Sequence, residues 1–332
     1  MGITGKIMVT GASGMLAQEI IHKLDDGNTM IYAVSADKNS INTTSLSPNV
    51  ICFNNTDIET DMYEWNDIYA IINCAFTRIN ENIQVIKSID LGIKIFNFAK
   101  KYHVKRVLNI SSRSIYIEPE EGTLNTENSS IGGGGCIGLG KYFSETAAQL
   151  VLENTNVKYT NLRLASINEV KVEKSMVRPM NVFVKKVINH ENITIVGGKQ
   201  VMSYIDLRDA AEGVISVLRI PDDIIKPVYN IGTGWKCTDT LLNIAQKVIN
   251  IGCDEFGYQK VEIEITPKDV NMHAGMDSTL LKKDSGWEAK YDKRVVQNVY
   301  FERSGIDCEK NNHKTKSNID SYICTSKILV FR

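Results

Sequence analysis

Short apolar runs alternate with longer stretches of mixed character over residues 1–165. Runs of this kind, rich in Ile and Val and bounded by Gly, Asn and Asp, predict buried β-strands. The mixed stretch 83–102 carries apolar residues such as Ile86, Ile89 and Ile93 near the helical period. Strands and helices joined by short links predict a parallel sheet covered by helices on both faces. The predicted strands are 7–9, 30–34, 50–53, 69–74, 104–110 and 158–165, and the predicted helices include 83–102 and 138–152.

The second half of the chain continues this alternation with shorter elements. With 332 residues and 43% apolar content, the chain is long enough for one large or two smaller domains. The expected fold class is therefore α/β. The pattern predicts helices at 181–188, 209–218 and 240–249, and strands at 228–232 and 261–265.

Two polar segments interrupt the pattern. Residues 118–136 hold Pro119 and end in four consecutive glycines at 132–135. They predict a mobile loop, in which the glycine run acts as a flexible hinge rather than as a phosphate cradle. From residue 304 onward the chain is polar and irregular, so we assign no role to the tail 304–332.

The charge balance narrows the possible partners. A net charge of −1 gives no basis for binding nucleic acid or an anionic membrane. No apolar run reaches the roughly 18 residues of a membrane span, and no signal-peptide pattern opens the chain. Seven scattered cysteines, with no pairing or metal-ligand spacing, indicate reduced thiols and no metal site. We therefore expect a cytoplasmic protein.

The most informative segment is the glycine turn at 11–17, which follows the first predicted strand. Its glycines are spaced Gly-x-x-Gly-x-x-Ala, and the run Ile20, Ile21, Leu24 after it predicts a helix. Gly11 permits a sharp turn, and Gly14 lets a ligand's pyrophosphate approach the backbone. The N–H groups at the helix N-terminus would then face an anion.

With four further features, this turn resembles the extended short-chain dehydrogenase/reductase family, in its branch of NAD-dependent, nucleotide-sugar epimerases and dehydratases. The resemblance spans roughly residues 5–300. It implies a Rossmann-type doubly wound parallel sheet with a smaller C-terminal substrate-binding domain. The features are 57–58, where members contact adenine, 73–76 at a strand end, 111–116 with the catalytic hydroxyl, and the later signatures 206–210 and 230–234.

The resemblance also implies roles for individual residues. Ser112 and Lys141 fall on the catalytic positions. The lysine of the family holds the nicotinamide ribose. The implied cofactor-binding residues are Gly11, Ala12, Ser13, Gly14, Met15, Leu16, Ser35, Asp37, Lys38, Asp57, Ile58, Cys74, Ala75, Phe76 and Lys141.

The same resemblance predicts the organisation of the chain. Residues 1–165 plus 205–235 would form the NAD(P)-binding domain. Residues 166–204 plus 236–303 would form the substrate domain, which binds a nucleotide-sugar. The helices at 83–102 and 138–152 carry more apolar residues than one buried face needs, so we expect a homodimer formed through them.

The largest departure from the family falls on the acid–base residue. Members carry Tyr-x-x-x-Lys on one helix, which places both side chains on one face. Here Ile137 stands four residues before Lys141, and no tyrosine lies between Ile117 and Gly140. Tyr142 would point about 100° around the helix from Lys141. Cys136 is a poor substitute beside the vacant position.

Two further departures concern the substrate. The family often has an arginine about seven residues before Asp209 that grips the nucleotide diphosphate, and Met202 stands there. Lys199 or Arg178 are the candidates to replace it. Arg113 and Ser114 follow Ser112 where the sugar 4,6-dehydratases have an acidic pair, which argues against that subgroup.

The choice between NAD and NADP stays open at the end of the second strand. A carboxylate there would bind both ribose hydroxyls and repel a 2′-phosphate. Ser35 and Lys38 tolerate a phosphate, whereas Asp37 could prefer the hydroxyls. The balance leans slightly to NADP.

Two functional hypotheses follow. The first is an epimerase, reductase or dehydratase, thus an isomerase or oxidoreductase, with altered acid–base chemistry. The second is a regulatory or binding protein that keeps the cofactor pocket without turnover. Ser112 and Lys141 fit both, and also fit a purely structural role. We further expect Trp235 and Trp287 in the core, and Asp206 and Asp209 as helix caps.

Overall fold

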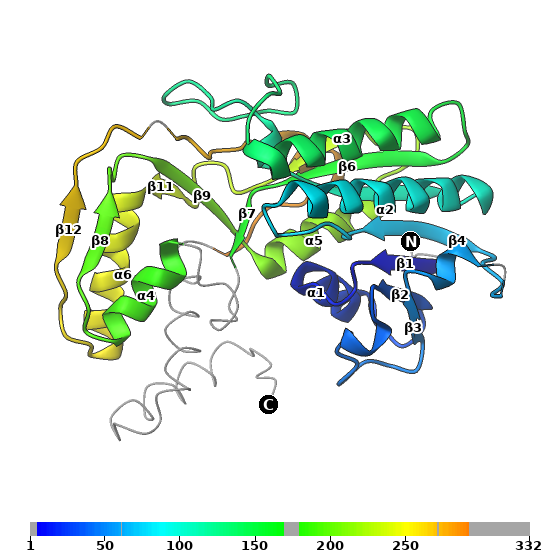
Figure 1. Ribbon diagram of the computed structural model, residues 1–332, viewed down its shortest axis with the longest axis horizontal. Coiled ribbons are helices and arrows are strands. Elements are labelled where there is room, and N and C mark those ends of the chain that lie inside the picture. Colours follow the sequence, from blue (N-terminus) through cyan, green and yellow to red (C-terminus); the bar gives the residue numbers. More distant parts are fainter. Residues whose placement is uncertain (1–4, 61, 169–178, 271, 292–332) are drawn as a thin grey trace. The chain divides into compact units, whose positions relative to one another are not determined.

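The computed structural model describes residues 5–60, 62–168, 179–270 and 272–291 (Figure 1). The predicted tail 304–332, the last part of the expected substrate domain at 292–303, and Arg178 therefore lie outside the described residues. The chain divides into two compact units. The described part of the first comprises residues up to Asn168, then Ser203–Thr238 and His273–Tyr291, and the described part of the second lies within 179–202 and 239–272.

A seven-stranded parallel sheet forms the centre of the first unit, in the order β10-β6-β5-β4-β1-β2-β3. Helices cover both of its faces, which confirms the predicted doubly wound α/β class (Figure 1). The strands are β1 Lys6–Thr10, β2 Ile31–Ser35, β3 Val50–Asn54, β4 Ile68–Asn73, β5 Arg106–Ser112, β6 Lys158–Leu164 and β10 Val228–Ile231.

Strand β1 shows how the two faces are filled. Ile7 and Val9 pack in the cluster that contains the buried residues of α1 (Met15–Leu24) and α5 (Leu207–Leu218). Met8 points to the other face and packs with residues of α2 (Asn82–Lys101) and α3 (Gly135–Leu152). Because both faces are buried, the strand is apolar at consecutive positions rather than at alternate ones.

The order of the strands in the sheet reverses between β1 and β4. Strands β2 and β3 lie on one side of β1, whereas β4, β5, β6 and β10 lie on the other. In doubly wound sheets, ligands bind beyond the carboxyl ends of the strands at such a reversal. The glycine turn after β1 and the 73–76 segment after β4 meet at this point.

The second unit is smaller and contains a two-stranded parallel sheet, β8 (Ile193–Val196) with β12 (Ile263–Thr266). Helices α4 (Pro179–Ile188) and α6 (Leu241–Phe256) pack against each other. Helix α6 continues beyond the predicted end at 249. Among the described helices, none has the length and apolar content needed to cross a membrane.

The sequence pattern did not predict several short elements. They have too few residues to show a period of their own. Strands β11, β9 and β7 form a separate three-stranded sheet. The elements are η1 Lys38–Ser40, η2 Asp57–Glu59, η3 Arg113–Ile115, β7 Ser166–Asn168, β8, β9 Val201–Asp206, β11 Thr238–Thr240 and α7 Thr279–Ser285.

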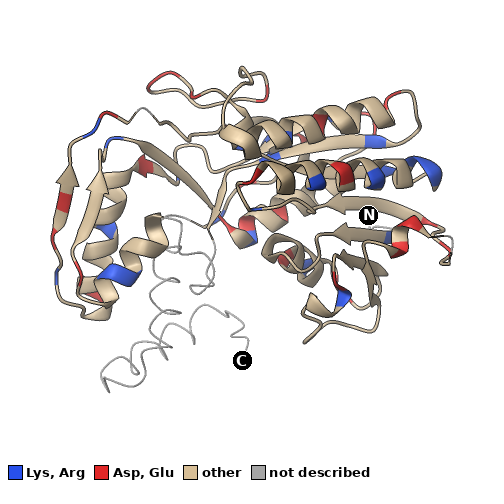
Figure 2. Cartoon of the chain, viewed as in Figure 1, with Lys and Arg blue, Asp and Glu red and all other residues tan. Residues whose placement is uncertain are grey.

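Acidic and basic residues are spread over the described elements without a long stretch of one sign (Figure 2). This distribution agrees with the net charge of −1. The two tryptophans behave differently from each other. Trp287 is buried as predicted, but Trp235 is 51% exposed, so its expected core position was wrong.

Candidate active site

Gly11 shapes the turn between β1 and α1. Its φ of +67° lies in the left-handed region. A Cβ on Gly11 would lie 2.8 Å from both the Ala75 nitrogen and the Cys74 carbonyl carbon, so only glycine permits the two strand ends to approach this closely. Gly14 donates its N–H to the Gly11 carbonyl at 2.9 Å and precedes α1 with no side-chain cap. The first N–H groups of α1 can therefore receive an anion.

Neutral side chains meet this turn at the end of β2. Ser35 is buried and donates its hydroxyl to Ser13 Oγ at 3.0 Å. The Asp37 carboxylate caps η1 by accepting the Asn39 N–H at 2.9 Å, while Lys38 is exposed. A hydroxyl pair, rather than a carboxylate, thus stands beside the turn, and both NAD and NADP remain compatible with it.

The segment after β3 is fixed by Asp57. Its Oδ2 accepts the backbone N–H of Asn54 at 2.7 Å, which closes the turn into η2. Ile58 is buried in the cluster shared with α2. These contacts hold the 57–58 backbone in place, and they engage one oxygen of the Asp57 carboxylate.

Four polar side chains form a row across the centre of the sheet, which we call the polar row: Thr10, Asn73, Asn109 and Asn161 on β1, β4, β5 and β6. They pair level with one another along neighbouring strands. Thr10 Oγ1 donates to Asn73 Oδ1 at 2.7 Å, and Asn73 Nδ2 and Asn109 Nδ2 each donate to the next asparagine at 3.0 Å. Asn73 Oδ1 also accepts the Ala75 N–H at 3.3 Å. The row therefore fixes the strand end against which Gly11 packs.

Ser112 ends β5 and begins η3. Its Oγ accepts from the Ser114 N–H at 3.2 Å and from the Ser114 hydroxyl at 3.0 Å, and the residue is partly exposed. With two hydrogen bonds accepted, the Ser112 hydroxyl keeps its own proton for donation.

The glycine run packs tightly against this segment at Gly133 and Gly134, and its role as a flexible hinge stays a prediction. A Cβ on Gly133 would lie 1.9 Å from the Tyr116 carbonyl oxygen, and one on Gly134 would lie 1.8 Å from that of Ser114. Gly138, inside α3, would meet the same Ser114 oxygen at 2.5 Å. The glycines let the start of α3 approach the backbone that carries Ser112.

Lys141 lies on α3 and reaches the carboxyl end of β5. Its Nζ donates to the Ile110 carbonyl at 2.5 Å and lies 4.1 Å from the centre of the Phe76 ring. Burial lowers the pKa of Lys141 to about 8, and Cys74 and Glu145 oppose that shift only in part. Burial also raises the pKa of the Cys74 thiol to about 12, so this thiol stays protonated at neutral pH.

Ile137 occupies the first turn of α3, one turn before Lys141 and on the same face. Within the described part of α3 the one tyrosine is Tyr142, which is directed elsewhere and is exposed. The Cys136 thiol donates to Asn80 Oδ1 at 2.9 Å. The helix therefore offers Lys141 no phenol neighbour.

Residues 7–232 match the model of the NAD dependent epimerase/dehydratase family. The chain belongs to this family. No curated protein sequence matches the chain. The fold is similar to solved epimerase/dehydratase-type structures at low sequence identity.

One similar structure is the UDP-glucose 4-epimerase of Thermotoga maritima with UDP-glucose, with a TM-score of 0.76 and 19% identity over 91% of this chain and 99% of that chain. Another is the UDP-N-acetylglucosamine 4-epimerase of Bacillus cereus, with a TM-score of 0.74 and 18% identity over 91% and 100%. A third is the Thermus thermophilus UDP-glucose 4-epimerase complex with NAD, with a TM-score of 0.73 and 16% identity over 90% and 98%.

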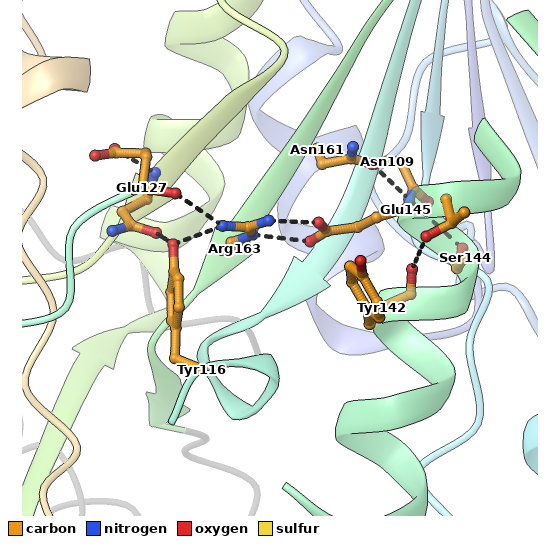
Figure 3. A network of polar contacts seen from close by, with 10 residues as sticks. Asn109, Tyr116, Glu127, Tyr142, Ser144, Glu145, Asn161 and Arg163 are labelled. Atoms are coloured by element: carbon orange, nitrogen blue, oxygen red, sulfur yellow. Dashed lines mark hydrogen bonds and ion pairs between the residues drawn. The ribbon is translucent and has the colours of Figure 1, made fainter. Parts of the chain in front are cut away.

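In this member of the epimerase/dehydratase family, a buried ion pair ties α3 to β6 (Figure 3). Arg163 donates from Nε and Nη2 to the two carboxylate oxygens of Glu145, at 3.0 and 2.7 Å, and both side chains are 5% exposed. Arg163 Nη1 also donates to the Tyr116 hydroxyl at 2.9 Å and to the Glu127 carbonyl at 3.2 Å. Although burial opposes it, the bond to Glu145 raises the pKa of Arg163, so the pair stays charged.

The sequence analysis missed Arg163 as a site-supporting residue. A single arginine between Leu162 and Leu164 in a predicted buried strand was the available signal, because such a charge needs a buried partner. Glu145 lies one turn after Lys141 on the same face of α3, so it was the natural partner to consider. Tyr116, also missed, donates to Asn230 Oδ1 at 2.7 Å and connects this network to β10.

Arg113, which follows Ser112, is largely buried. Its Nη1 donates to the His273 carbonyl at 3.2 Å, and its Nη2 contacts Glu118 Oε1 at 3.4 Å. The exposed Trp235 ring lies edge-on to the His273 ring, with 5.7 Å between their centres. A positively charged side chain therefore follows Ser112, at the place where the sugar 4,6-dehydratases have an acidic pair.

The remaining candidates belong to other segments of the chain. Met202 is partly buried and Lys199 is exposed, and both belong to the second unit. Asp206 caps α5 by accepting the Arg208 N–H at 2.8 Å, as predicted. Asp209 does not cap a helix: it lies inside α5 and accepts the N–H groups of Lys290 and Tyr291, at 3.0 and 2.9 Å.

Proposed function

We propose that the chain is an NAD(P)-binding, nucleotide-sugar epimerase-like protein whose ordinary 4-epimerase turnover is weak or absent. One observation supports this proposal above the others. Ser112 and Lys141 stand at the carboxyl edge of the sheet beside the glycine turn, while Ile137 replaces the family's tyrosine. Positioned acid–base groups contribute about 10²–10⁴ in rate, so the loss of one corresponds to roughly 3–5 kcal/mol of barrier.

The residues present fit a nicotinamide dinucleotide. The close approach at Gly11 and the uncapped start of α1 suit a pyrophosphate, and Ser35 with Asp37 and Lys38 would meet the adenosine ribose. Lys141 would meet the nicotinamide ribose. Bound there, the cofactor would supply a hydride acceptor for a sugar carbon. The similar Thermus thermophilus epimerase, solved with NAD, supports this assignment.

We assign the sugar to the neighbourhood of Ser112. Similar structures were solved with UDP-glucose and with UDP-N-acetylmuramic acid, which supports a nucleotide-sugar ligand. Met202 cannot grip a diphosphate as an arginine would, so another residue must do so or the affinity is lower.

Titration with NAD and NADP tests the cofactor assignment. The variant Gly14→Val should lose affinity at least about tenfold, because its side chain would enter the pyrophosphate path. Gly14 has a φ of −77°, so the variant should keep its melting temperature within a few degrees. If the unaltered protein binds neither dinucleotide, the proposal is wrong.

The variant Ile137→Tyr tests the chemistry. Both forms are assayed with UDP-, GDP- and dTDP-sugars, and Phe143→Tyr serves as a matched control. Phe143 is exposed on the same helix, so its variant adds a phenol away from the face of Lys141. A gain with Ile137→Tyr alone supports a repurposed epimerase site. Ordinary epimerase rates in the unaltered protein would refute the impaired chemistry.

The alternative function is a non-catalytic NAD(P)-binding regulatory protein of the same fold. The absence of the phenol favours it, because cofactor binding does not need that group. It becomes the better account if both forms bind the dinucleotide while neither binds or converts any nucleotide-sugar. Isothermal titration with each sugar nucleotide separates these outcomes.

A homodimer completes the proposal. Helices α2 and α3 pack against each other in the first unit, and each carries exposed apolar side chains, which together we call the α2–α3 patch. A two-fold interface needs only one self-complementary surface, and this patch could serve as one. The patch comprises Ile83, Ile86, Ile93, Leu139, Tyr142, Phe143 and Leu150.

A further inference from the structure

The loss of the family's tyrosine raises the question of which group exchanges protons in its place. A candidate must lie near the end of β5 and must change its protonation state near neutral pH. Among the described residues around Lys141, the ionisable neighbours that influence it are Cys74 and Glu145. Each of them can be tested on its contacts.

Neither neighbour is suited to the task. Burial raises the pKa of Cys74 to about 12, which keeps its thiol protonated. Both oxygens of the Glu145 carboxylate accept hydrogen bonds from Arg163, and the pair is buried. Burial likewise raises the pKa of Tyr116 to about 12, and its hydroxyl donates to Asn230. These groups hold their protons or charges fixed.

Lys141 differs from them in its contacts. Its ammonium has three N–H bonds, one of which goes to the Ile110 carbonyl, and Phe76 covers it on one side. Neither contact is with a carboxylate, so no direct ion pair holds the charge of Lys141. Burial lowers the pKa of Lys141 to about 8, so a useful fraction is the neutral amine near pH 7.5.

The position of Lys141 brings it within reach of the reacting alcohol. Ile110 lies two residues before Ser112 on β5, about 6–7 Å along the strand. A lysine stem has four methylenes, so Nζ can move from the Ile110 carbonyl toward a hydroxyl held at Ser112. Ile137 leaves no phenol between them, and Ser112 keeps its own proton to donate to the substrate oxygen.

We infer that Lys141 is itself the proton acceptor for the substrate alcohol, with Ser112 as the hydrogen-bond donor that positions that alcohol. The inference rests on the proposed nucleotide-sugar function. In the oxidation step the alcohol carbon loses a hydride to the oxidised nicotinamide dinucleotide. The alcohol O–H bond breaks, and its proton passes to the Lys141 Nζ, which becomes an ammonium. In the reverse step, the hydride and the proton return to the carbonyl group.

This role predicts the pH dependence of the oxidation step. Only the neutral amine accepts a proton, and its fraction rises as pH increases through the pKa of Lys141. The rate should therefore increase about tenfold per pH unit below pH 8 and level off above it. Introducing Tyr at position 137 should move the profile, because the phenol would then take over the proton.

The experiment measures reduction of bound NAD by UDP-, GDP- and dTDP-sugars in a single turnover, from pH 6 to 10. Lys141→Arg keeps the positive charge but cannot deprotonate, so it separates ribose binding from proton transfer. Lys158→Arg is the control, because Lys158 lies at the amino end of β6, away from the carboxyl ends of the strands. A second readout is independent of turnover: the pH dependence of amine labelling at Lys141, followed by mass spectrometry.

We expect Lys141→Arg to bind NAD within about threefold of the unaltered protein and to lose at least about 100-fold in the reduction rate. Labelling of Lys141 should have its midpoint near pH 8. A reduction rate within tenfold in Lys141→Arg, or a labelling midpoint near 10.5, overturns the inference alone. If the unaltered protein reduces no NAD with any sugar, the proposed reaction and the inference both fail.

Discussion

Gly11 and Gly14 act differently although both belong to one turn. Gly11 has a positive φ and lies against backbone atoms of the neighbouring strand end, whereas Gly14 has an ordinary φ and only the Gly11 carbonyl, 3.1 Å away, near its missing Cβ. Substitution at Gly11 should therefore damage the fold. Substitution at Gly14 should damage ligand binding instead.

The variant Gly11→Ala should lower the free energy of unfolding by at least about 3 kcal/mol, because strain at positive φ adds to a clash with Cys74 and Ala75. Gly27→Ala is the matched control. Gly27 has a φ of +77° with nothing within 4 Å, so it should cost only about 1–2 kcal/mol. Chemical denaturation measures both. Equal losses in the two variants would show that the close approach at Gly11 is not important for stability.

For individual residues, the sequence predicted the local backbone conformation better than it predicted side-chain contacts. Gly11 and the Asp206 cap follow from local rules, and the structure agrees with both. The exposure of Trp235 and the contacts of Asp209 depend on segments distant in sequence, such as 290–291, and no local pattern contains that information. The same is true of the bond between Arg163 and Glu145.

Among the elements, α3 is the most important for the candidate site, and two sets of contacts determine its placement. The glycines at 133, 134 and 138 bring its start close to the Ser112 segment. About two turns after Gly138, Glu145 attaches the helix to β6 through Arg163. Lys141 lies between these two attachments, so both restrict where its amine can reach.

The variant Arg163→Met should destabilise the fold by about 3–5 kcal/mol, because it leaves the Glu145 carboxylate buried without a partner. The double variant Arg163→Met with Glu145→Leu removes both charges and should recover much of that loss. Thermal denaturation distinguishes the two forms. A double variant as unstable as the sum of its single variants would indicate that the two side chains act independently.

The polar row offers a second test at this scale. The variant Asn109→Ala leaves amide groups of Asn73 and Asn161 without partners in the buried sheet and should cost about 1–3 kcal/mol. Asn97→Ala, on the exposed side of α2, is the control and should change stability by less than about 0.5 kcal/mol. Urea titration measures both, and equal effects would contradict a special role for the row.

For the whole molecule, the alternation of strands and helices was enough to predict the doubly wound sheet, because strands such as β1 are apolar on both faces. The second unit was harder to predict. Strands such as β8 have four residues, and α6 runs past 249 because Gly252 is tolerated inside it. Element existence was therefore more predictable than element boundaries.

The α2–α3 patch leads to a prediction about assembly. We expect the protein at micromolar concentration to have twice the mass of one chain by light scattering. Leu150→Asp should shift it to a monomer, because Leu150 is 73% exposed within the patch and a charge there would be buried in the dimer. Ile224→Asp, outside the patch, should leave the dimer intact. A monomeric unaltered protein would refute the interface.

The polar row also affects how the sheet can assemble. When both faces of a strand are apolar, sliding it by one residue exchanges one apolar face for another, and burial alone penalises the error weakly. The row changes this, because a slipped strand would place an amide opposite an apolar side chain and leave it unpaired in the interior. Thr10, Asn73, Asn109 and Asn161 thus make misaligned sheets costly during folding, and the correct alignment is the one that sets the end of β4 against Gly11.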